Sequence, residues 1–315
     1  MPHADRPAPT LTGVTAPPLV CCGLATLDVV QRVDRVPGAD EKLVARGLDV
    51  TFGGPAANAA ATAAALGVPA VLLTALGSGP IARLVRDGLV AAGVRVVDLA
   101  AGSPGDPPVS TVLVTASTGQ RAVVSTNATL RPDDLGPAAT RAADDVLAAA
   151  GAVLVDGHHL AAGVAVAAAA RRRGIPVVAD AGSWKPGLEH LLAQVDVAIL
   201  SADLVVPAVA LAREPGAAED VLASVAALGP MFVARSAGAA PVRVRLPSGA
   251  YDEVAPPRLR PDEVVDTLGA GDVLHGAAGA ALARGLDPLA ALREGVAAAT
   301  ESVRHPGALG WAAHR

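Results

Sequence analysis

The chain has 315 residues, of which 52% are hydrophobic and 17% are charged, and its formal net charge is −5. This composition excludes a largely disordered chain, and the acidic balance gives no overall basic field that would bind nucleic acid or an anionic membrane. Aromatic residues make up only 2% of the chain, so we expect a core of small side chains on closely packed helices and strands. The length fits one large α/β domain, alone or with a small appendage.

Three features bear on where the protein works. No residue between Val50 and Ala82 carries a charge, but glycines and prolines divide this stretch into pieces shorter than the ~20 apolar residues that span a membrane. Residues 1–18 lack the apolar run of a signal peptide and are expected to form a flexible N-terminal tail. The two cysteines, Cys21 and Cys22, are adjacent, which suits neither a disulfide framework nor a metal site. We therefore expect a cytoplasmic protein without a membrane partner.

Apolar strand-like runs alternate with alanine-rich helical stretches along most of the chain. In chain order, the expected elements are strand 19–24, helix 56–66, strand 70–76, helix 80–92, strand 94–99, helix 135–149, strand 152–155, helix 163–173, strands 176–179 and 197–200, helix 217–228, strand 231–234, and helices 272–284 and 288–302. This alternation predicts a mostly parallel sheet with helices on both faces.

Two stretches, 31–52 and 109–125, break the alternation because they are rich in β-forming residues, more polar, and contain no long helix. We expect them to pair as a small antiparallel sheet beside the main one. The sequence shows no internal repeat and no long linker. It therefore predicts one core domain over residues 19–315 that carries a lid-like insertion.

The strongest motif spans residues 265–273, which read VDTLGAGDV. A Gly-Ala-Gly turn that opens a helix leaves backbone N–H groups unpaired and adds the positive end of the helix dipole, which together make an anion site. Asp272 follows the turn directly. It is either a helix-terminal carboxylate stabilised by the dipole, or a base that takes a proton from a hydroxyl attacking a phosphorus held at the turn.

A second motif spans residues 52–60, which read FGGPAANAA and lead into a helix. The glycine pair permits a close approach of backbone. Asn58 is either a capping or turn residue, or an amide that both donates to and accepts from the hydroxyls of a polyol. Asp28 follows the first strand, at the edge of the sheet where open α/β folds bind ligands, although an aspartate there also often caps a loop.

Together these residues resemble the ribokinase-like (PfkB) family of carbohydrate kinases, and the resemblance extends from about Val20 to Trp311. Two signatures in the right order at opposite ends of an α/β chain are far more specific than either alone. The resemblance implies a three-layer α/β sandwich with a mostly parallel central sheet and a small β-sheet lid. It implies ATP-dependent phosphorylation of a sugar hydroxyl with Mg²⁺ bridging the phosphates, and a homodimer formed through the lid.

The resemblance also assigns roles to individual residues. Asp272 would be the catalytic base, and lid residue Arg121 would either point towards the active site or be solvated. By the same resemblance, the anion hole would be formed by Gly269, Ala270 and Gly271. The sugar site would be formed by Asp28, Gly53, Gly54 and Asn58.

The sequence departs from the family pattern on the nucleotide side. The usual Asn-x-x-Glu element reads SADL at residues 201–204, and the strand at 232–238 (FVARSAG) lacks the usual Thr-x-Gly pattern. The expected nucleotide contacts are therefore Ser201, Arg235, Ser236 and Gly238, together with Gly269 and Gly271.

Two further positions bear on a cation and on the sugar. Asp266 matches the family's site for a monovalent cation such as K⁺, although Trp311 stands where a small polar residue is common. His275 and residues 304–308 (RHPGA) are similar to ketohexokinase-like members and bacterial sulfofructose kinases. A ketose is the expected substrate, with ribose and nucleosides left open.

Two other functions remain open. Residues 77–82 (GSGPIA) open a helix after a strand, and Asp98 ends the next strand, as in the fingerprint of an NAD-binding oxidoreductase. The altered nucleotide segments also allow a catalytically idle sugar- or nucleotide-binding protein on the same fold. Asp156, His158 and His159 end another strand at the predicted ligand edge, where they are candidates for substrate contact.

Overall fold

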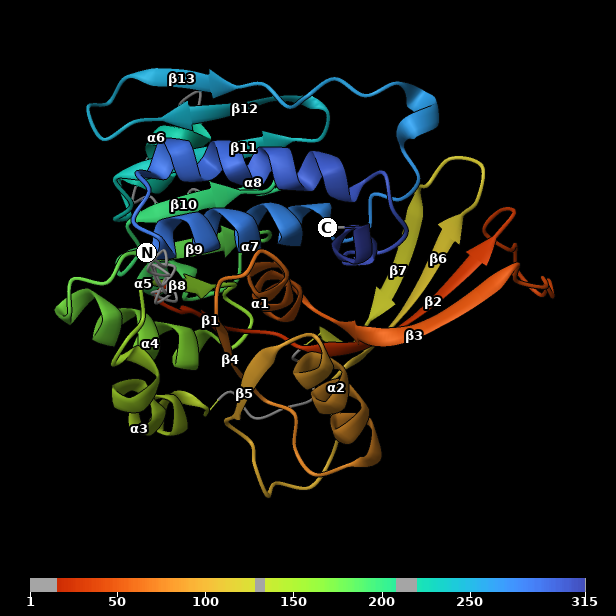
Figure 1. Ribbon diagram of the computed structural model, residues 1–315, viewed down its shortest axis with the longest axis horizontal. Coiled ribbons are helices and arrows are strands. Elements are labelled where there is room, and N and C mark those ends of the chain that lie inside the picture. The colour runs from red at the N-terminus through yellow and green to blue at the C-terminus, as the bar shows by residue number, and fades with distance from the viewer. Residues whose placement is uncertain (1–15, 128–133, 208–219, 315) are drawn as a thin grey trace, which may run out of the picture.

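The computed structural model describes residues 16–127, 134–207 and 220–314, and a nine-stranded sheet forms its centre (Figure 1). The strand order is β13-β12-β11-β10-β9-β8-β1-β4-β5. The strands are β1 (Leu19–Cys22), β4 (Ala70–Thr74), β5 (Val94–Asp98), β8 (Ala152–Val155), β9 (Val177–Ala181), β10 (Val197–Leu200), β11 (Phe232–Ala237), β12 (Ala240–Arg245) and β13 (Tyr251–Val254). From β5 to β11 all neighbours are parallel, whereas β12 and β13 add an antiparallel edge that the sequence analysis missed.

Helices cover both faces of this sheet. The first face carries α1 (Pro55–Ala65), α2 (Pro80–Ala91), α7 (Ala270–Ala283) and α8 (Pro288–Ser302), and the second carries α3 (Gly136–Leu147), α4 (Leu160–Arg172), α5 (Leu188–Leu192) and α6 (Val221–Ala226). The predicted three-layer α/β sandwich is therefore confirmed. No helix in the described ranges is both long and apolar enough to cross a membrane.

Strand β1 shows how the sequence builds two cores from one strand. Leu19 and Cys21 join the core beneath α1 and α7, and Val20 and Cys22 join the core on the other face. This follows because successive side chains of a strand point to opposite faces. The two thiols are free, and burial raises the pKa of both.

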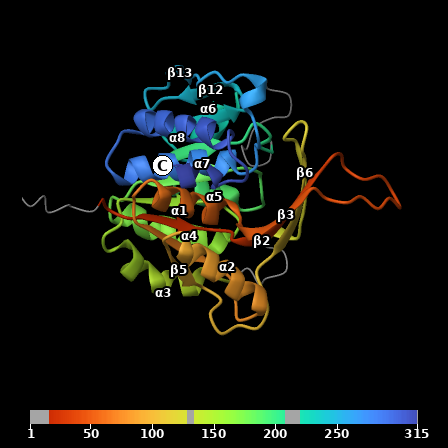
Figure 2. The same cartoon turned by 45° about the vertical axis from the view of Figure 1, so that its right-hand side comes forward.

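A second sheet of four strands, which we call the lid, projects from the body of the molecule (Figure 2). Its order is β3-β2-β6-β7, formed by β2 (Thr26–Val33), β3 (Gly47–Gly53), β6 (Val109–Thr115) and β7 (Arg121–Ser125). The lid starts at Thr26 rather than at the predicted residue 31, because only residues 23–25 separate β1 from β2. Strands β2 and β6 are parallel, so the expected purely antiparallel sheet was wrong. Each of these two strands enters the lid from the body, and they therefore run in the same direction.

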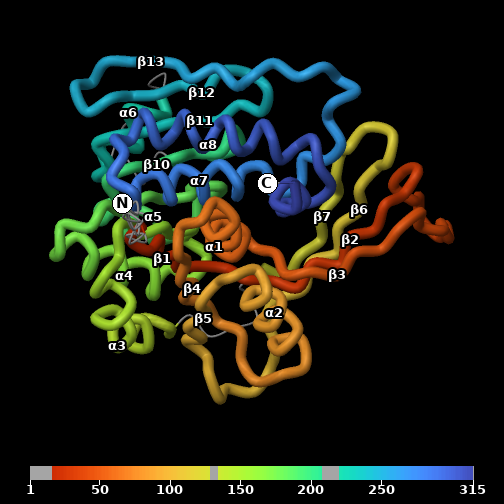
Figure 3. Tube along the Cα trace, in the orientation of Figure 1, coloured from red at the N-terminus to blue at the C-terminus, as the bar shows by residue number. Residues whose placement is uncertain are grey.

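Helices α1, α7 and α8 lie one beside the next on the first face (Figure 3). Their close approach depends on glycine. A Cβ atom at Gly276 of α7 would lie 2.5 Å from the carbonyl oxygen of Ala59 in α1, and one at Gly295 of α8 would lie 2.6 Å from the carbonyl oxygen of Leu274. With so few aromatic residues, the core gains its density from this close contact of helix backbones.

We expect Gly276→Ala to lower the free energy of unfolding by about 1–2 kcal/mol, because overpacking against the backbone of α1 outweighs the gain in helix propensity. Urea unfolding monitored by circular dichroism measures the change. Gly88→Ala in α2 is the matched control, because its Cβ would meet the movable ring of Phe52 at 3.0 Å rather than backbone. Equal losses in the two variants would contradict this explanation.

Candidate active site

The candidate active site lies where the carboxyl ends of the central parallel strands meet the first turn of α7. Asp180 lies in β9 near its carboxyl end, and Ser201 follows β10. Nε2 of His275 in α7 lies 3.1 Å from the carbonyl oxygen of Ile199 in β10, which fixes α7 against this edge. The sheet therefore exposes its ligand-binding edge, as expected for an open α/β fold, beneath the positive end of a helix.

Asn58 and Asp272, which belong to the two separate sequence motifs, are in direct contact. Nδ2 of Asn58 donates a hydrogen bond to Oδ2 of Asp272 at 2.7 Å. The N-cap of α1 is Gly54, so Asn58 is not the cap of its own helix. Because α1 and α7 cross at Ala59 and Gly276, the first turns of both helices meet at this edge of the sheet.

The Asp272 carboxyl can exchange a proton near neutral pH. Removal from solvent raises its pKa to about 7, and the negative charge of Asp180 adds to the increase. The hydrogen bond from Asn58 and the charge of His275 act in the opposite direction. The side chain is only half-buried, so a hydroxyl group brought to the site can reach it.

The Gly-Ala-Gly turn opens α7 as predicted and leaves part of its backbone free. Gly269 is the N-cap at φ 74°, and a Cβ there would lie 2.4 Å from Cβ of Ala308, which closes the turn from behind. The amide of Ala270 donates to the carbonyl oxygen of Thr267 at 3.4 Å. The amides of Gly271 and Asp272 have no carbonyl one turn earlier in the helix, and a Cβ at Gly271 would meet no atom within 4 Å. These two amides therefore have no backbone acceptor, and there is room beside Gly271.

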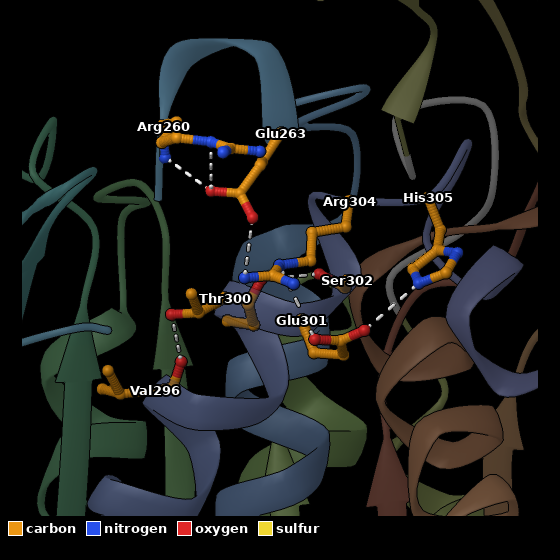
Figure 4. Close-up of polar contacts among 9 residues, drawn as sticks. Arg260, Glu263, Val296, Thr300, Glu301, Ser302, Arg304 and His305 are labelled. Carbon is orange, nitrogen blue, oxygen red and sulfur yellow. Dashed lines mark hydrogen bonds and ion pairs between the residues drawn. The ribbon is translucent and has the colours of Figure 1, made fainter. Parts of the chain in front are cut away.

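The segment at residues 304–308 supports the turn from behind. Arg304 lies between Glu263 and Glu301, and His305 lies against Glu301 (Figure 4). The guanidinium of Arg304 is 3.3 Å from a carboxylate oxygen of Glu263 and 3.8 Å from one of Glu301. Nε2 of His305 is 3.2 Å from the other oxygen of Glu301. Since Glu263 lies in the 3₁₀ helix η3 (Pro261–Glu263), these contacts link the end of α8 to the segment that leads into the turn. They hold the segment that carries Ala308 against Gly269.

Asp266, the predicted cation ligand, is 2% exposed and closes two turns. Its Oδ1 accepts a hydrogen bond from the amide of Leu268 and its Oδ2 accepts one from the amide of Gly307, both at 2.9 Å. Trp311 in η4 (Gly310–His314) is buried nearby, and its indole N–H donates to the carbonyl oxygen of Ala308 at 2.8 Å. Each oxygen of this buried carboxylate therefore has a backbone amide as a partner. Within the described ranges, no group of three or more acidic, histidine or cysteine side chains is arranged to hold a metal ion.

A cavity of about 270 Å³ separates the inner face of the lid from the C-terminal segment. Asp28 and Asn58 both line it, so the structure brings these two predicted sugar-site residues together. Asp28 lies within lid strand β2 rather than in a loop after the first strand, and Oγ1 of Thr26 donates to its Oδ1 at 2.6 Å. Burial raises the pKa of Asp28.

The glycine pair at residues 53 and 54 does not line the cavity, but it allows close packing beside it. A Cβ at Gly53 would lie 1.9 Å from an oxygen of Asp28, and one at Gly54 would lie 2.6 Å from the carbonyl oxygen of Leu24. Gly54 also has a φ of 96°, which non-glycine residues rarely adopt. The two glycines, predicted to belong to the sugar site, thus make room for the Asp28 carboxylate and for the chain that follows β1.

The cavity wall also contains three polar side chains that were not predicted from the sequence, Arg32, Asp49 and Thr51. Arg32 and Asp49 form an ion pair at 3.6 Å. The strand register, in which Asp28 pairs with Thr51, places these residues on the inner face. Alternation within β2 and β3 could have identified each face separately, but not which face turns towards the cavity.

The sequence analysis also missed Lys185, which follows β9. It is half-buried and burial lowers its pKa, whereas the charges of Asp156 and Asp180 raise it. A lysine in a loop carries no sequence signal that distinguishes it from a solvated one.

Arg121, on β7, contacts Thr267 just before the Gly-Ala-Gly turn and does not line the cavity. Its Nη1 donates to the carbonyl oxygen of Thr267 at 3.2 Å and to Oγ1 of the same residue at 3.1 Å. At the tip of the same hairpin, a Cβ at Gly119 would lie 3.1 Å from the carbonyl oxygen of Val265. The lid therefore closes onto the segment that leads into α7.

Four of the six residues predicted for the nucleotide gather at the ends of β10 and β11, and Gly269 and Gly271 lie at the start of α7. Leu200 pairs with Arg235 in the parallel register, and Oγ of Ser236 donates to the carbonyl oxygen of Leu200 at 3.2 Å. The guanidinium of Arg235 donates to the carbonyl oxygen of Ala202, and Gly238 lies in the β11–β12 turn at φ 59°. Together with Ser201, they form a half-exposed surface next to the strand that His275 contacts.

Asp156 has a structural role. Its carboxylate accepts hydrogen bonds from the amides of Leu24, Ala56 and His158 at 2.7, 3.2 and 2.9 Å. It thereby joins the end of β1 to the start of α1. His159, the other predicted neighbour, is buried at the start of α4.

The oxidoreductase alternative does not fit the structure. The Asp98 carboxylate accepts from the amides of Leu76 and Gly77 at 2.9 and 3.1 Å and pairs with Arg86 at 2.7 Å, so it is not free for a ribose. A Cβ at Gly79 would lie 2.1 Å from an oxygen of Asp106, whose side chain fills the space that a pyrophosphate would need.

Comparison with known proteins agrees with this geometry. Residues 17–312 match the pfkB family carbohydrate kinase. A ribokinase from Arabidopsis thaliana is 26% identical over 326 aligned residues, which cover 98% of this chain and 82% of that protein.

Solved structures share the fold. The Arabidopsis thaliana ribokinase complexed with ribose and ATP has a TM-score of 0.69 and 25% identity over 94% of this chain and 95% of that one. A putative ribokinase from Agrobacterium tumefaciens has a TM-score of 0.74 and 24% identity over 94% of both chains. A microbiome-derived acarbose kinase has a TM-score of 0.76 and 22% identity over 92% of this chain and 93% of that one. With its matching segment, both signatures and this fold, the chain belongs to the pfkB family of carbohydrate kinases and is a phosphotransferase with an alcohol acceptor.

Proposed function

We propose that this kinase transfers the γ-phosphoryl group of MgATP to a hydroxyl of a small sugar, with Asp272 as the general base. The observation that carries the proposal is the hydrogen bond between Asn58 and Asp272. It joins a residue that lines the polar cavity to a carboxyl whose pKa is about 7, one residue from open backbone amides. A base, an acceptor site and a phosphate site thus share one edge of the sheet.

In this mechanism the sugar occupies the cavity, where Asp28 and Asn58 hydrogen-bond its hydroxyls. ATP, with Mg²⁺ on its phosphates, lies over the ends of β10 and β11. The acceptor hydroxyl gives its proton to Asp272 as its oxygen attacks the γ-phosphorus, the new O–P bond forms, and the bond to the β-phosphate oxygen breaks to release ADP. The amides of Gly271 and Asp272 stabilise the charge on the transferring group. The closed lid excludes water, the competing nucleophile.

For the sugar itself, we propose a ketose. Support comes from His275 and residues 304–308, which resemble ketohexokinase-like sequences and which here form part of the α7 start and its backing. The similarity to ribokinases makes ribose the second candidate. Measuring ADP release with a panel of ketoses, aldoses and nucleosides distinguishes the candidates, and a preference for ribose would overturn the ketose assignment.

A catalytically idle binding protein is the second candidate function, favoured by the altered element at residues 201–204. Against it stands the carboxyl of Asp272, which burial holds at a pKa suited to proton transfer. A protein that only binds a sugar has no need for such a group beside open amides.

We expect Asp272→Asn to lower kcat by about 10²–10⁴-fold, which is the scale of general-base catalysis. The affinity for ATP, measured by calorimetry, should stay unchanged.

In the parent enzyme kcat should fall about tenfold per pH unit below pH 7, because the protonated carboxyl accepts no proton. The raised pKa also means that ionising Asp272 costs folding stability as the pH rises towards 7, so the variant should be the more stable protein above that pH.

Asp87→Asn, an exposed aspartate on α2, is the matched control and should alter none of these properties. Near-normal kcat in Asp272→Asn would defeat the base assignment. An acid limb centred near pH 4 would contradict the raised pKa.

We expect Asn58→Ala to raise KM for the sugar about tenfold or more and to leave KM for ATP unchanged, because a hydrogen bond to a hydroxyl is lost. It should also move the acid limb of kcat to higher pH. The hydrogen bond from Asn58 lowers the pKa of Asp272, so its removal raises that pKa. Thr51→Val is the control, because Thr51 lines the cavity from the lid. That variant should raise KM for the sugar without moving the limb, and equal effects on both substrates in Asn58→Ala would remove Asn58 from the sugar site.

We also propose that the enzyme is a homodimer that pairs through the outer face of the lid. Leu48 and Val50 on β3 and Val124 on β7 are 61%, 54% and 75% exposed. The strand registers place them on the face opposite the inner cluster of Val30 and Val112. An apolar sheet face of this kind is typical of an interaction surface.

The double variant Val50→Asp, Val124→Asp should sediment as a monomer, because each carboxylate would be buried unpaired in the interface. Val90→Asp on α2, at a residue 59% exposed, serves as the control and should leave the dimer intact. A parent enzyme that sediments as a monomer at micromolar concentration would rule out the lid interface.

A further inference from the structure

His275 occupies an unusual position one turn into α7, directly behind the candidate base. It is 7% exposed, and both of its ring nitrogens face carbonyl oxygens. Nδ1 lies 2.6 Å from the carbonyl oxygen of Gly271, and Nε2 lies 3.1 Å from the carbonyl oxygen of Ile199 in β10.

These two contacts favour one form of the ring. A carbonyl oxygen only accepts hydrogen bonds, and a neutral imidazole carries only one N–H. In either neutral tautomer, one ring nitrogen would direct its lone pair at a carbonyl oxygen. Only the doubly protonated imidazolium donates to both carbonyls.

The surroundings of His275 supply the counter-charge. Oδ2 of Asp180 in β9 lies 3.4 Å from Nδ1 of His275, and this carboxylate is itself 9% exposed. The positive charge of His275 opposes the effect of burial on the pKa of Asp180. The other charged or titratable groups that act on Asp180 and Asp272 are Asp156 and His158 after β8, Lys185 after β9, and Asp28 on β2.

We propose that His275 is a positioning residue for phosphoryl transfer: as an imidazolium it ties the peptide unit between Gly271 and Asp272 to β10 and holds a positive charge behind the base. This inference rests on the proposed role of Asp272. The carbonyl of Gly271 and the amide of Asp272 belong to the same peptide unit. A charge-assisted hydrogen bond to that carbonyl therefore polarises the amide and strengthens it as a donor to the transferring phosphoryl group.

The charge of His275 stabilises the ionised form of Asp272, against the effects of burial and of Asp180. Loss of the charge should thus move the ionisation of Asp272 to higher pH. Removal of a hydrogen bond alone, without loss of charge, would not produce this shift.

The experiment compares the full-length parent enzyme with His275→Asn, whose amide keeps one donor near Gly271 but carries no charge. Long-range ¹H–¹⁵N spectra of the parent at pH 7 should show protons on both ring nitrogens of His275. In the variant, the Asp272 carboxyl resonance should titrate at higher pH by about one unit. Its kcat should fall about tenfold on the plateau above the acid limb, with KM for the sugar unchanged.

His190→Asn is the matched control, because the side chain of His190 on α5 is 78% exposed, and it should alter none of these readouts. A singly protonated His275 ring at pH 7, or an Asp272 titration unmoved in His275→Asn, would overturn the proposal. If His275→Asn does not fold, the ring protonation of the parent enzyme decides by itself. The ring and carboxyl measurements need no catalysis. An unimpaired Asp272→Asn enzyme would therefore defeat the proposed base without changing their outcome.

Discussion

The contact between α1 and α7 is the constraint on which the site depends. Gly276 of α7 lets the two helix backbones touch at Ala59 of α1. Asp272 lies one turn before Gly276, so this contact brings its carboxylate to the side-chain amide of Asn58. The cavity wall and the proposed base are therefore fixed by the same packing that builds the alanine-rich core. A wider separation of the helices would break the hydrogen bond between Asn58 and Asp272 and separate the cavity from the Gly-Ala-Gly turn.

Charge at this edge of the sheet is balanced by a few specific partners. Asp180 is buried, Asp28 and Asp272 are half-buried, and burial raises the pKa of each. His275 and Asn58 favour the ionised form of Asp272, so its pKa stays near neutrality instead of rising further. The tension between burial and these partners makes an aspartate useful as a base at physiological pH. The lid contacts the segment before α7 through the hydrogen bond from Arg121 to Thr267.

The sequence carried the fold and the two ends of the site, but not their geometry. Alternating strands and helices predicted the three-layer sandwich, and the Gly-Ala-Gly turn predicted the open amides of α7. The β12–β13 edge was missed because its strands are partly exposed. They therefore lack the continuous apolar runs that predicted the buried strands, and no helix separates them. The roles of Asp156 and Asp98 were uncertain because the backbone amides that they bind come from distant segments. Likewise, no pattern in one strand could show that Thr51 and Asp49 face the same cavity as Asn58.

The central claim is that the Asp272 carboxylate and the amides at the start of α7 act on the same phosphorus atom. The most direct measurement is a crystal structure with the sugar, MgADP and a planar metal-fluoride mimic of the transferring phosphoryl group. The account predicts an Asp272 oxygen within hydrogen-bond distance of the acceptor oxygen, and the amides of Gly271 and Asp272 on the fluorides. A mimic bound away from this turn, or a carboxylate that points away from the acceptor, would contradict it.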